Sequence, residues 1–267
     1  MSILDRRLFT ERYPREAGET RIYNLIILDE SGSMSVIDAQ ALNGVNQTLQ
    51  SIREAQQENP DDHQMISLVT FKSLFSGPEV RAVIDMERIE NVQNLNPNQY
   101  RPQGGTPLFD AVGDSIEDLE DMVKEGDHVL VSIITDGEEN TSRYYTEELI
   151  RRRIEELSAK GWVFTYIGAN QDSEKNAAAI GIRCTMDFKF SIEGSEIMFD
   201  KMRSSNREYY KKVRREKTTG ERIDYNNDFF SQRQALTRVT PEHIDRLEQN
   251  QIFVFGSVCK VWDYVKI

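Results

Sequence analysis

Residues 22–28 form an almost unbroken apolar run that contains one polar residue, Asn24. A strand of this composition is typical of a parallel sheet that is buried on both faces. The apolar residues between Leu42 and Ile52 then recur every three or four positions, which predicts a helix with one buried face. The first part of the chain therefore has the strand-then-helix order of an α/β fold.

The same alternation continues along the chain. Further strands are predicted at residues 65–71, 80–84, 128–135, 162–167 and 184–188, and further helices at 106–122, 146–160 and 172–180. This pattern predicts an α/β sandwich with a mostly parallel central sheet flanked by helices. Such folds bind ligands beyond the carboxyl ends of their strands, so a site should follow residues 28 and 135.

Two of the predicted helices have recognisable start signals. Ser35 is predicted to cap the first helix, with Asp38 three residues later in the manner of a capping box. Thr106 and Pro107 are predicted to occupy the N-cap and the first helical position of the next helix, where these residue types are favoured.

The composition limits the classes of function. The formal net charge of −12 argues against general nucleic-acid binding, which needs a cationic surface. No apolar run approaches the roughly 20 residues that cross a bilayer. Residues 1–20 lack the apolar stretch of a secretory signal, so a cytoplasmic protein with no membrane contact is expected. The two cysteines and three histidines have no ligand spacing, so no zinc site is predicted.

Three short polar segments lie where strands are predicted to end or a helix to begin. Their oxygen-bearing side chains are Asp29, Ser31, Ser33, Thr106 and Asp136. The first three alternate along the chain, so an extended turn can point all of them the same way. Two carboxylates and three hydroxyls, without nitrogen or sulfur, suit Mg²⁺ or Mn²⁺ and disfavour zinc or copper. Each segment alone could be a helix cap or an ordinary turn, but their occurrence together predicts a metal site.

The charge of these donors also predicts the kind of ligand. If the two carboxylates act through water, the direct protein ligands of the ion are neutral hydroxyls. The ion then favours an anionic ligand at an open position. The expected partner is therefore a protein, not identified by the sequence, that supplies an Asp or Glu side chain.

The motifs DxSxS, Gly-Gly-Thr and Thr-Asp-Gly resemble the metal-ion-dependent adhesion site of von Willebrand factor A domains. Asp29, Ser31 and Ser33 match the first motif, Thr106 the second and Asp136 the third, so all five positions are intact. In that family the hydroxyls usually contact the ion directly and the aspartates often act through water. The segments DESGSM, GGTPLFDA and ITDGEENTS are most similar to stand-alone bacterial members.

The resemblance covers residues 21–188 and implies a Rossmann-like three-layer sandwich. Its sheet would have the order 3-2-1-4-5-6 with one antiparallel edge strand, for which residues 80–84 are the candidate. The chain is accordingly divided into an N-terminal arm at 1–20, a von Willebrand factor A domain at 21–190 and a mainly helical extension at 191–267.

Within the extension, a helix is predicted at 197–217, and its basic residues are expected to form a solvated face. Tyr225, Phe229 and Phe230 are candidate apolar anchors. Another helix is expected to begin at Thr240, and residues 251–258 form a possible strand. That strand could join the edge of the main sheet or open a further domain, and both alternatives stay open.

The function predicted from the sequence is a metal-dependent protein-binding module without enzymatic activity. One alternative is a Mg²⁺-dependent phosphoryl-transfer enzyme, but such phosphatases need a second carboxylate two positions after the first, where this chain has Ser31. No phosphate-binding GxxxxGK[ST] loop is present either. A regulatory subunit of an ATPase or of a kinase–phosphatase system is a further alternative. Four polar residues beside the donors, Glu30, Glu138, Glu139 and Asn140, are expected to be solvated.

Overall fold

The computed structural model describes residues 3–16, 18–169, 173–189, 191–221, 225, 229 and 230. All of these belong to one compact unit, Met1–Ser231. The predicted domain boundaries at 20/21 and 190/191 fall inside this unit. The helix expected to begin at Thr240 and the possible strand at 251–258 lie outside the described residues.

The strands of the described region form one six-stranded sheet with the order β3-β2-β1-β4-β5-β6. They are β1 (Arg21–Asp29), β2 (His63–Leu74), β3 (Gly77–Arg88), β4 (His128–Thr135), β5 (Val163–Ala169) and β6 (Cys184–Phe188). Every neighbouring pair is parallel except β2 and β3. The predicted strand order is confirmed, and so is the antiparallel edge, although β3 is longer than the predicted 80–84.

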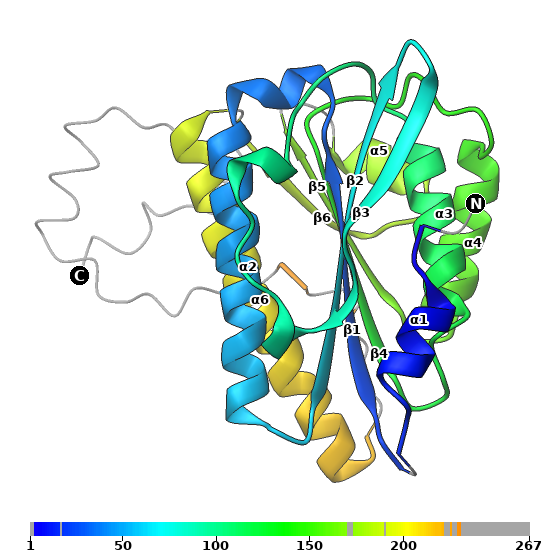
Figure 1. The fold of residues 1–267 in the computed structure, drawn as a ribbon, viewed down its shortest axis with the longest axis vertical. Coiled ribbons are helices and arrows are strands. Elements are labelled where there is room, and N and C mark those ends of the chain that lie inside the picture. The colour runs from blue at the N-terminus through cyan, green and yellow to red at the C-terminus, as the bar shows by residue number, and fades with distance from the viewer. Residues whose placement is uncertain are drawn as a thin grey trace, which may run out of the picture. The chain divides into compact units, whose positions relative to one another are not determined.

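Helices cover both faces of this sheet. They are α1 (Arg6–Arg12), α2 (Asp38–Glu58), α3 (Leu108–Glu120), α4 (Glu147–Ala159), α5 (Ser173–Ala179) and α6 (Ile192–Thr219), and short 3₁₀ turns lie at η1 (Gly32–Val36), η2 (Ile89–Asn91) and η3 (Pro97–Gln99). Figure 1 shows α2 and α6 on one face and α1, α3 and α4 on the other. The predicted three-layer sandwich is confirmed. Within the described part of the chain, the search for a helix long and apolar enough to cross a membrane finds none.

The central strand β1 is buried on both faces, as its composition predicts. Ile22, Ile26 and Leu28 pack in the core under α2 and α6, whereas the alternate residues Tyr23 and Leu25 pack in the core under α3 and α4. Alternate side chains of a strand point to opposite faces, so both cores depend on this one strand.

Asn24 is the polar exception in β1, and the structure explains how it is accommodated. Its side chain donates to Gln64 Oε1 at 2.9 Å and to the carbonyl oxygen of Met65 at 3.0 Å. It also accepts a hydrogen bond from the Tyr210 hydroxyl at 2.7 Å. A buried amide therefore keeps its hydrogen bonds and connects β1 to α6.

Helix α6 packs along α2 and belongs to the main fold. Its buried residues Met198, Met202, Tyr209, Tyr210 and Val213 lie in the same core cluster as the apolar face of α2. Tyr225, Phe229 and Phe230 are buried in this cluster, which confirms them as anchors, and the Tyr209 and Tyr225 rings lie 5.1 Å apart between centroids.

Several basic residues of α6 form ion pairs with acidic residues of the main fold. Arg207 pairs with Glu54 of α2, and Lys217 Nζ lies 2.7 Å from Asp62 Oδ1. Arg214 pairs with Glu58 of α2 at 3.1 Å. Arg207 and Lys217 are exposed, as a solvated face requires, whereas Arg214 is only partly exposed. The ion pairs themselves could not be read from the local pattern, because the acidic partners lie about 150 residues earlier in the sequence.

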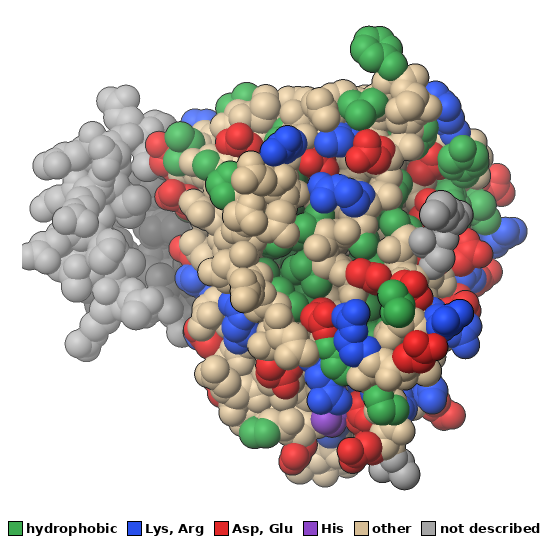
Figure 2. Space-filling model, viewed as in Figure 1, with side chains coloured by type: hydrophobic (Ala, Val, Ile, Leu, Met, Phe, Trp, Pro, Cys, Tyr) green, Lys and Arg blue, Asp and Glu red, His purple; other side chains and the backbone are tan. Residues whose placement is uncertain are grey.

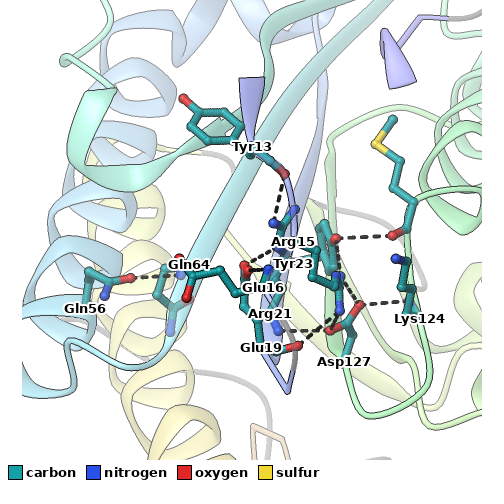
Figure 3. Close-up of polar contacts among 11 residues, drawn as sticks. Tyr13, Arg15, Glu16, Glu19, Arg21, Tyr23, Gln56, Gln64, Lys124 and Asp127 are labelled. Atoms are coloured by element: carbon teal, nitrogen blue, oxygen red, sulfur yellow. Dashed lines mark hydrogen bonds and ion pairs between the residues drawn. The ribbon is translucent and has the colours of Figure 1, made fainter. Parts of the chain in front are cut away.

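The segment before β1 is held at the opposite end of the sheet by a network of charged groups (Figure 3). Both terminal nitrogens of the Arg15 guanidinium donate to the Asp127 carboxylate, at 2.8 and 2.7 Å, and the Arg21 backbone N–H donates to the same carboxylate at 2.9 Å. The Arg21 side chain pairs with Glu19 and donates to the carbonyl oxygen of Tyr13. This network holds the start of β1 at the end of the sheet opposite the candidate site.

Candidate metal centre

The three polar segments predicted from the sequence meet at the carboxyl edge of the sheet. Strands β1 and β4 are parallel neighbours, and their register pairs Leu28 with Ile134. Asp29 is the last residue of β1, and Asp136 directly follows the last residue of β4. The sheet order therefore brings the first and third motifs together, at the place predicted for a ligand site.

The donor atoms of these motifs lie close to one another. Ser31 Oγ and Ser33 Oγ are 3.1 Å apart, and Ser33 Oγ donates to Asp136 Oδ1 at 2.8 Å. Thr106 and Asp29 border the same small residue, because a Cβ added to Gly137 would lie 2.9 Å from Thr106 Oγ1 and 3.6 Å from Asp29 Oδ2. All five predicted side chains are thus brought together.

This donor set fits a small divalent cation. Magnesium takes octahedral oxygen ligands at about 2.0–2.1 Å, so neighbouring ligands are about 2.9 Å apart. The 3.1 Å between the Ser31 and Ser33 hydroxyls is close to that spacing. The described residues contain no cluster of three His, Cys, Asp or Glu side chains. The donors of this site are instead two carboxylates and three hydroxyls, a combination that suits Mg²⁺ or Mn²⁺.

Asp29 is fully buried, and both of its carboxylate oxygens are engaged. Oδ1 accepts the backbone N–H of Ser31 at 2.7 Å, and Oδ2 accepts the Thr135 hydroxyl at 2.6 Å. Burial raises the pKa of Asp29 to about 6, although these hydrogen bonds favour its charged form. Burial also raises the pKa of Asp136, against the effect of the Ser33 hydroxyl. Two partly desolvated carboxylates are thus held close together, an arrangement that a cation stabilises.

Glu30, which follows Asp29, is not the solvated residue expected from the sequence. Its carboxylate accepts the backbone N–H of Arg101 at 2.6 Å and lies 3.3 Å from both Lys72 Nζ and Arg81 Nη2. Its backbone oxygen accepts the N–H of Gln103 at 2.8 Å. Glu30 therefore attaches the loop before Thr106 to the end of β1.

The same loop is also connected to the end of β2. Gly105 and Ser73 exchange two backbone hydrogen bonds of 2.9 Å, and Gly32 N–H donates to the carbonyl oxygen of Gly104 at 3.0 Å. Gly104 has φ +74°, and a Cβ there would lie 2.0 Å from the carbonyl oxygen of Ser73. Only glycine fits this left-handed, closely packed position, which places Thr106 at the site.

Thr106 does not cap α3, contrary to the prediction. The helix begins at Leu108 with Pro107 at its N-cap and no side-chain cap there. The free N–H groups of the first turn are instead bound by the loop after β4: Glu139 Oε2 accepts from Phe109 N, and Ser142 Oγ accepts from Asp110 N. The Thr106 side chain is consequently not used for capping.

Asn140 holds the Thr106 backbone from both sides. Its side-chain oxygen accepts the Thr106 N–H at 2.9 Å, and its own N–H donates to the Thr106 carbonyl oxygen at 3.1 Å. Asn140 and Glu139 therefore position the second motif. Of the four neighbours expected to be solvated loop residues, only Glu138 lies exposed without a role in this scaffold.

The predicted cap at Ser35 is also wrong. Residues Gly32–Val36 form a 3₁₀ turn, and α2 begins only at Asp38, with Ile37 at its N-cap and no side-chain cap. This turn starts directly after Ser31, and Ser33 within it donates to Asp136.

Two positioning residues were missed by sequence reasoning. Thr135 donates to Asp29 and could have been recognised, since it is the threonine of the Thr-Asp-Gly motif. The Tyr100 hydroxyl donates to the backbone oxygen of Asp29 at 2.6 Å. Tyr100 lies in a turn-rich loop, and no local pattern there indicates its contact with β1.

A sequence profile of the von Willebrand factor type A domain matches residues 25–204, more than half of the chain. The chain belongs to the von Willebrand factor type A domain family. A search of curated proteins finds no match.

Among solved structures, this chain is similar to the pilus adhesin SpaC from Lactobacillus rhamnosus GG in its open conformation. The TM-score is 0.55 and the sequence identity 15%, and the match covers 73% of this chain and 31% of SpaC. A second structure of SpaC has a TM-score of 0.54 at the same identity, and the match covers 71% of this chain and 31% of SpaC. A von Willebrand factor type A protein from Catenulispora acidiphila gives 0.47 at 15% identity, over 70% and 43%. The chain thus spans about a third of the length of SpaC, and the likeness shows the fold.

Proposed function

We propose that this von Willebrand factor type A domain binds one Mg²⁺ or Mn²⁺ ion through Asp29, Ser31, Ser33, Thr106 and Asp136, and uses it to hold an acidic side chain of a partner protein. The observation that carries the proposal is the meeting of three hydroxyls and two carboxylates at one edge of the sheet, with the serine oxygens 3.1 Å apart. When bound, the ion supplies a positively charged open position for an external carboxylate.

The side chains around the site divide this work. Asp29 is buried with both oxygens engaged, so it supplies negative charge and orients the Ser31 backbone. Thr135 and Tyr100 hold Asp29, and Asn140 holds the Thr106 backbone. The hydroxyls add no charge, which leaves room for one anionic ligand from outside. A chain with a net charge of −12 needs such a local cation to attract an acidic group.

The metal part of the proposal is tested by calorimetric titration of Mn²⁺ into the wild type, Asp136→Ala and Asp38→Ala. Asp38 is the matched control, because it is an exposed aspartate at the same edge of the sheet. We expect Asp136→Ala to abolish Mn²⁺ binding and Asp38→Ala to keep the wild-type affinity. The circular dichroism spectra of both variants should match that of the wild type. Unchanged Mn²⁺ affinity in Asp136→Ala would remove the proposed site.

The partner part is tested by affinity capture in Mg²⁺ and in EDTA, followed by substitution of each Asp and Glu in the captured interface. We expect capture to need Mg²⁺, and one carboxylate of the partner to be essential. Equal capture in EDTA would show that recognition uses another surface.

We also propose that the site is not catalytic, because the hydroxyls that contact carboxylates there, those of Ser33 and Thr135, serve to hold the ion and to orient Asp29. Phosphate-ester, nucleotide and peptide hydrolysis in Mg²⁺ should therefore not exceed that of Asp29→Ala. Turnover that is lost in Asp29→Ala would favour the phosphoryl-transfer alternative. The cytoplasmic setting and the stand-alone bacterial type stay predictions.

A further inference from the structure

Large hydrophobic side chains are unusually exposed around the candidate metal centre. Within the described residues, the exposed large hydrophobic side chains are Leu8, Val36, Phe75, Tyr144, Ile192 and Ile197. Three of them lie on the loops that carry the metal motifs or on the β2–β3 turn joined to one of these loops: Phe75 is fully exposed, Tyr144 is 74% exposed and Val36 is 65% exposed. Single exposed hydrophobic residues are ordinary, but a group around one site indicates an interaction surface.

Each of these three residues is fixed to one motif. Val36 ends the 3₁₀ turn that begins directly after Ser31. Phe75 lies in the turn between β2 and β3, two residues after Ser73, which is paired with Gly105. Both apolar residues therefore lie on segments that are joined to the motifs of the candidate site.

Tyr144 lies in the loop that positions Thr106. Its backbone N–H donates to Asp110 Oδ1 at 2.9 Å, and the N–H of Arg143 donates to Asp110 Oδ2 at 2.8 Å. Asp110 is buried in the first turn of α3, so this loop is firmly attached to the helix. Because this loop is already ordered, a partner that contacts Tyr144 loses less affinity to the entropic cost of ordering the loop.

A cation lies between two of the apolar groups. A Cβ built on Gly77 would lie 2.6 Å from Arg143 Nη1, so the guanidinium rests against the β2–β3 turn that carries Phe75. Arg143 is exposed and has no acidic partner within the described part of the chain. Figure 2 shows hydrophobic and cationic side chains together at the end of the molecule where the β2–β3 hairpin lies.

We propose that Val36, Phe75, Tyr144 and Arg143, here called the rim, dock a partner segment in which apolar side chains flank the metal-binding Asp or Glu. This inference rests on the proposed function and specifies its partner. The apolar flanks would cover the three exposed hydrophobic side chains. The partner's acidic character complements Arg143, which strengthens recognition and speeds association.

Exposed carboxylates at this edge, including Asp38, Glu79 and Glu138, set a limit on the charge of the segment. They offset the positive charges of Arg101 and Arg143, which are also exposed. A segment with a long acidic run gains little from such a mixed surface. The rim therefore fits one carboxylate with apolar neighbours better than a polyacidic sequence.

The test uses a random-peptide phage library with a fixed central Asp, selected on the full chain in Mg²⁺ and eluted with EDTA. We expect the selected peptides to carry Leu, Ile, Phe, Tyr or Trp beside the Asp. The variant Val36→Ser/Phe75→Ser/Tyr144→Ser should lose about tenfold or more of the recovery of these peptides, as expected for loss of aromatic interface anchors. Its Mn²⁺ affinity and thermal midpoint should stay unchanged, because all three side chains are exposed.

The control is Leu8→Ser/Ile197→Ser, which removes exposed hydrophobic side chains from α1 and α6, outside the rim. It should keep the full recovery. Selection of Asp peptides without any preference for apolar flanks would overturn the rim inference and leave the metal site standing. No Mg²⁺-dependent selection of any peptide, despite Mn²⁺ binding, would overturn the proposed mode of partner binding itself.

Discussion

Glu30 connects the end of β1 to the loop before Thr106. Neutralising its charge by Glu30→Gln should lower the free energy of unfolding by an amount that follows from its contacts. The Glu30 side chain is 2% exposed and its partner Lys72 is 8% exposed, whereas Arg81 is 40% exposed. Removing the charge leaves the Lys72 ammonium buried without a counter-charge, because the nearby Arg101 carbonyl oxygen supplies only a weak acceptor at 3.3 Å. Arg81 can turn toward water and should contribute little.

Breaking one side of a buried ion pair typically costs about 3–5 kcal/mol. We expect Glu30→Gln to lower the free energy of unfolding by about 3 kcal/mol, at the lower end, because the glutamine oxygen can still accept from Arg101 N. Mn²⁺ affinity should fall as well, since the loop that carries Thr106 is attached through Glu30. Urea unfolding followed by circular dichroism measures the first effect, and calorimetric titration measures the second.

The matched control is Glu54→Gln, which removes a surface partner of Arg207 and should cost less than about 1 kcal/mol. Adding Lys72→Met to Glu30→Gln should recover part of the loss, because the unpaired charge is then gone. A loss below about 1 kcal/mol in Glu30→Gln, with no recovery in the double variant, would refute the argument that this pair is a buried structural contact.

Three further predictions concern other parts of the molecule. Gly44→Ala should lower the free energy of unfolding by about 1–3 kcal/mol, because the added Cβ would lie 2.0 Å from the Phe199 ring. This loss is expected although alanine has a higher helix propensity than glycine. An unchanged urea midpoint would contradict this packing. Burial favours the neutral form of Asp62, but the hydrogen bonds from Lys217 and Asn59 and the charges of Lys217 and Arg214 together outweigh it and lower the pKa of Asp62. The stabilisation by Asp62 is therefore present at neutral pH and lost as the pH falls through that lowered pKa. Asp62→Asn should therefore destabilise at pH 7 and progressively less on acidification, and an equal urea-midpoint difference throughout would exclude the linkage. Thr106→Ala should lower Mn²⁺ affinity about tenfold or more with little change in thermal midpoint, since Thr106 caps no helix, while Thr106→Ser should keep the affinity.

The sequence predicted most of the sheet because each strand carries its own local signal. The apolar run before Asp29 is buried on both faces, and the strand ends fall where the polar motifs begin. That the five oxygen-bearing side chains would lie close together was predictable for the same reason, as each is part of a short motif. What local patterns could not show are contacts across long sequence distances.

Glu30 illustrates that difference. It looks like an ordinary loop residue, because its cationic partners Lys72 and Arg81 lie far along the chain. The caps predicted at Ser35 and Thr106 failed similarly: the local signals were correct in type, but a 3₁₀ turn and the loop around Glu139 replaced them. Tertiary contacts at the candidate site override the residue preferences of isolated helices.

The most direct test of the metal centre is a crystal structure of the chain with Mn²⁺, with data collected for anomalous scattering. We predict one anomalous peak at the carboxyl edge, about 2.0–2.3 Å from the hydroxyl oxygens of Ser31, Ser33 and Thr106. Asp29 and Asp136 should lie next to it, directly or through water. A map with no peak among these hydroxyls, at a Mn²⁺ concentration that saturates the calorimetric titration, would contradict the assignment of this site.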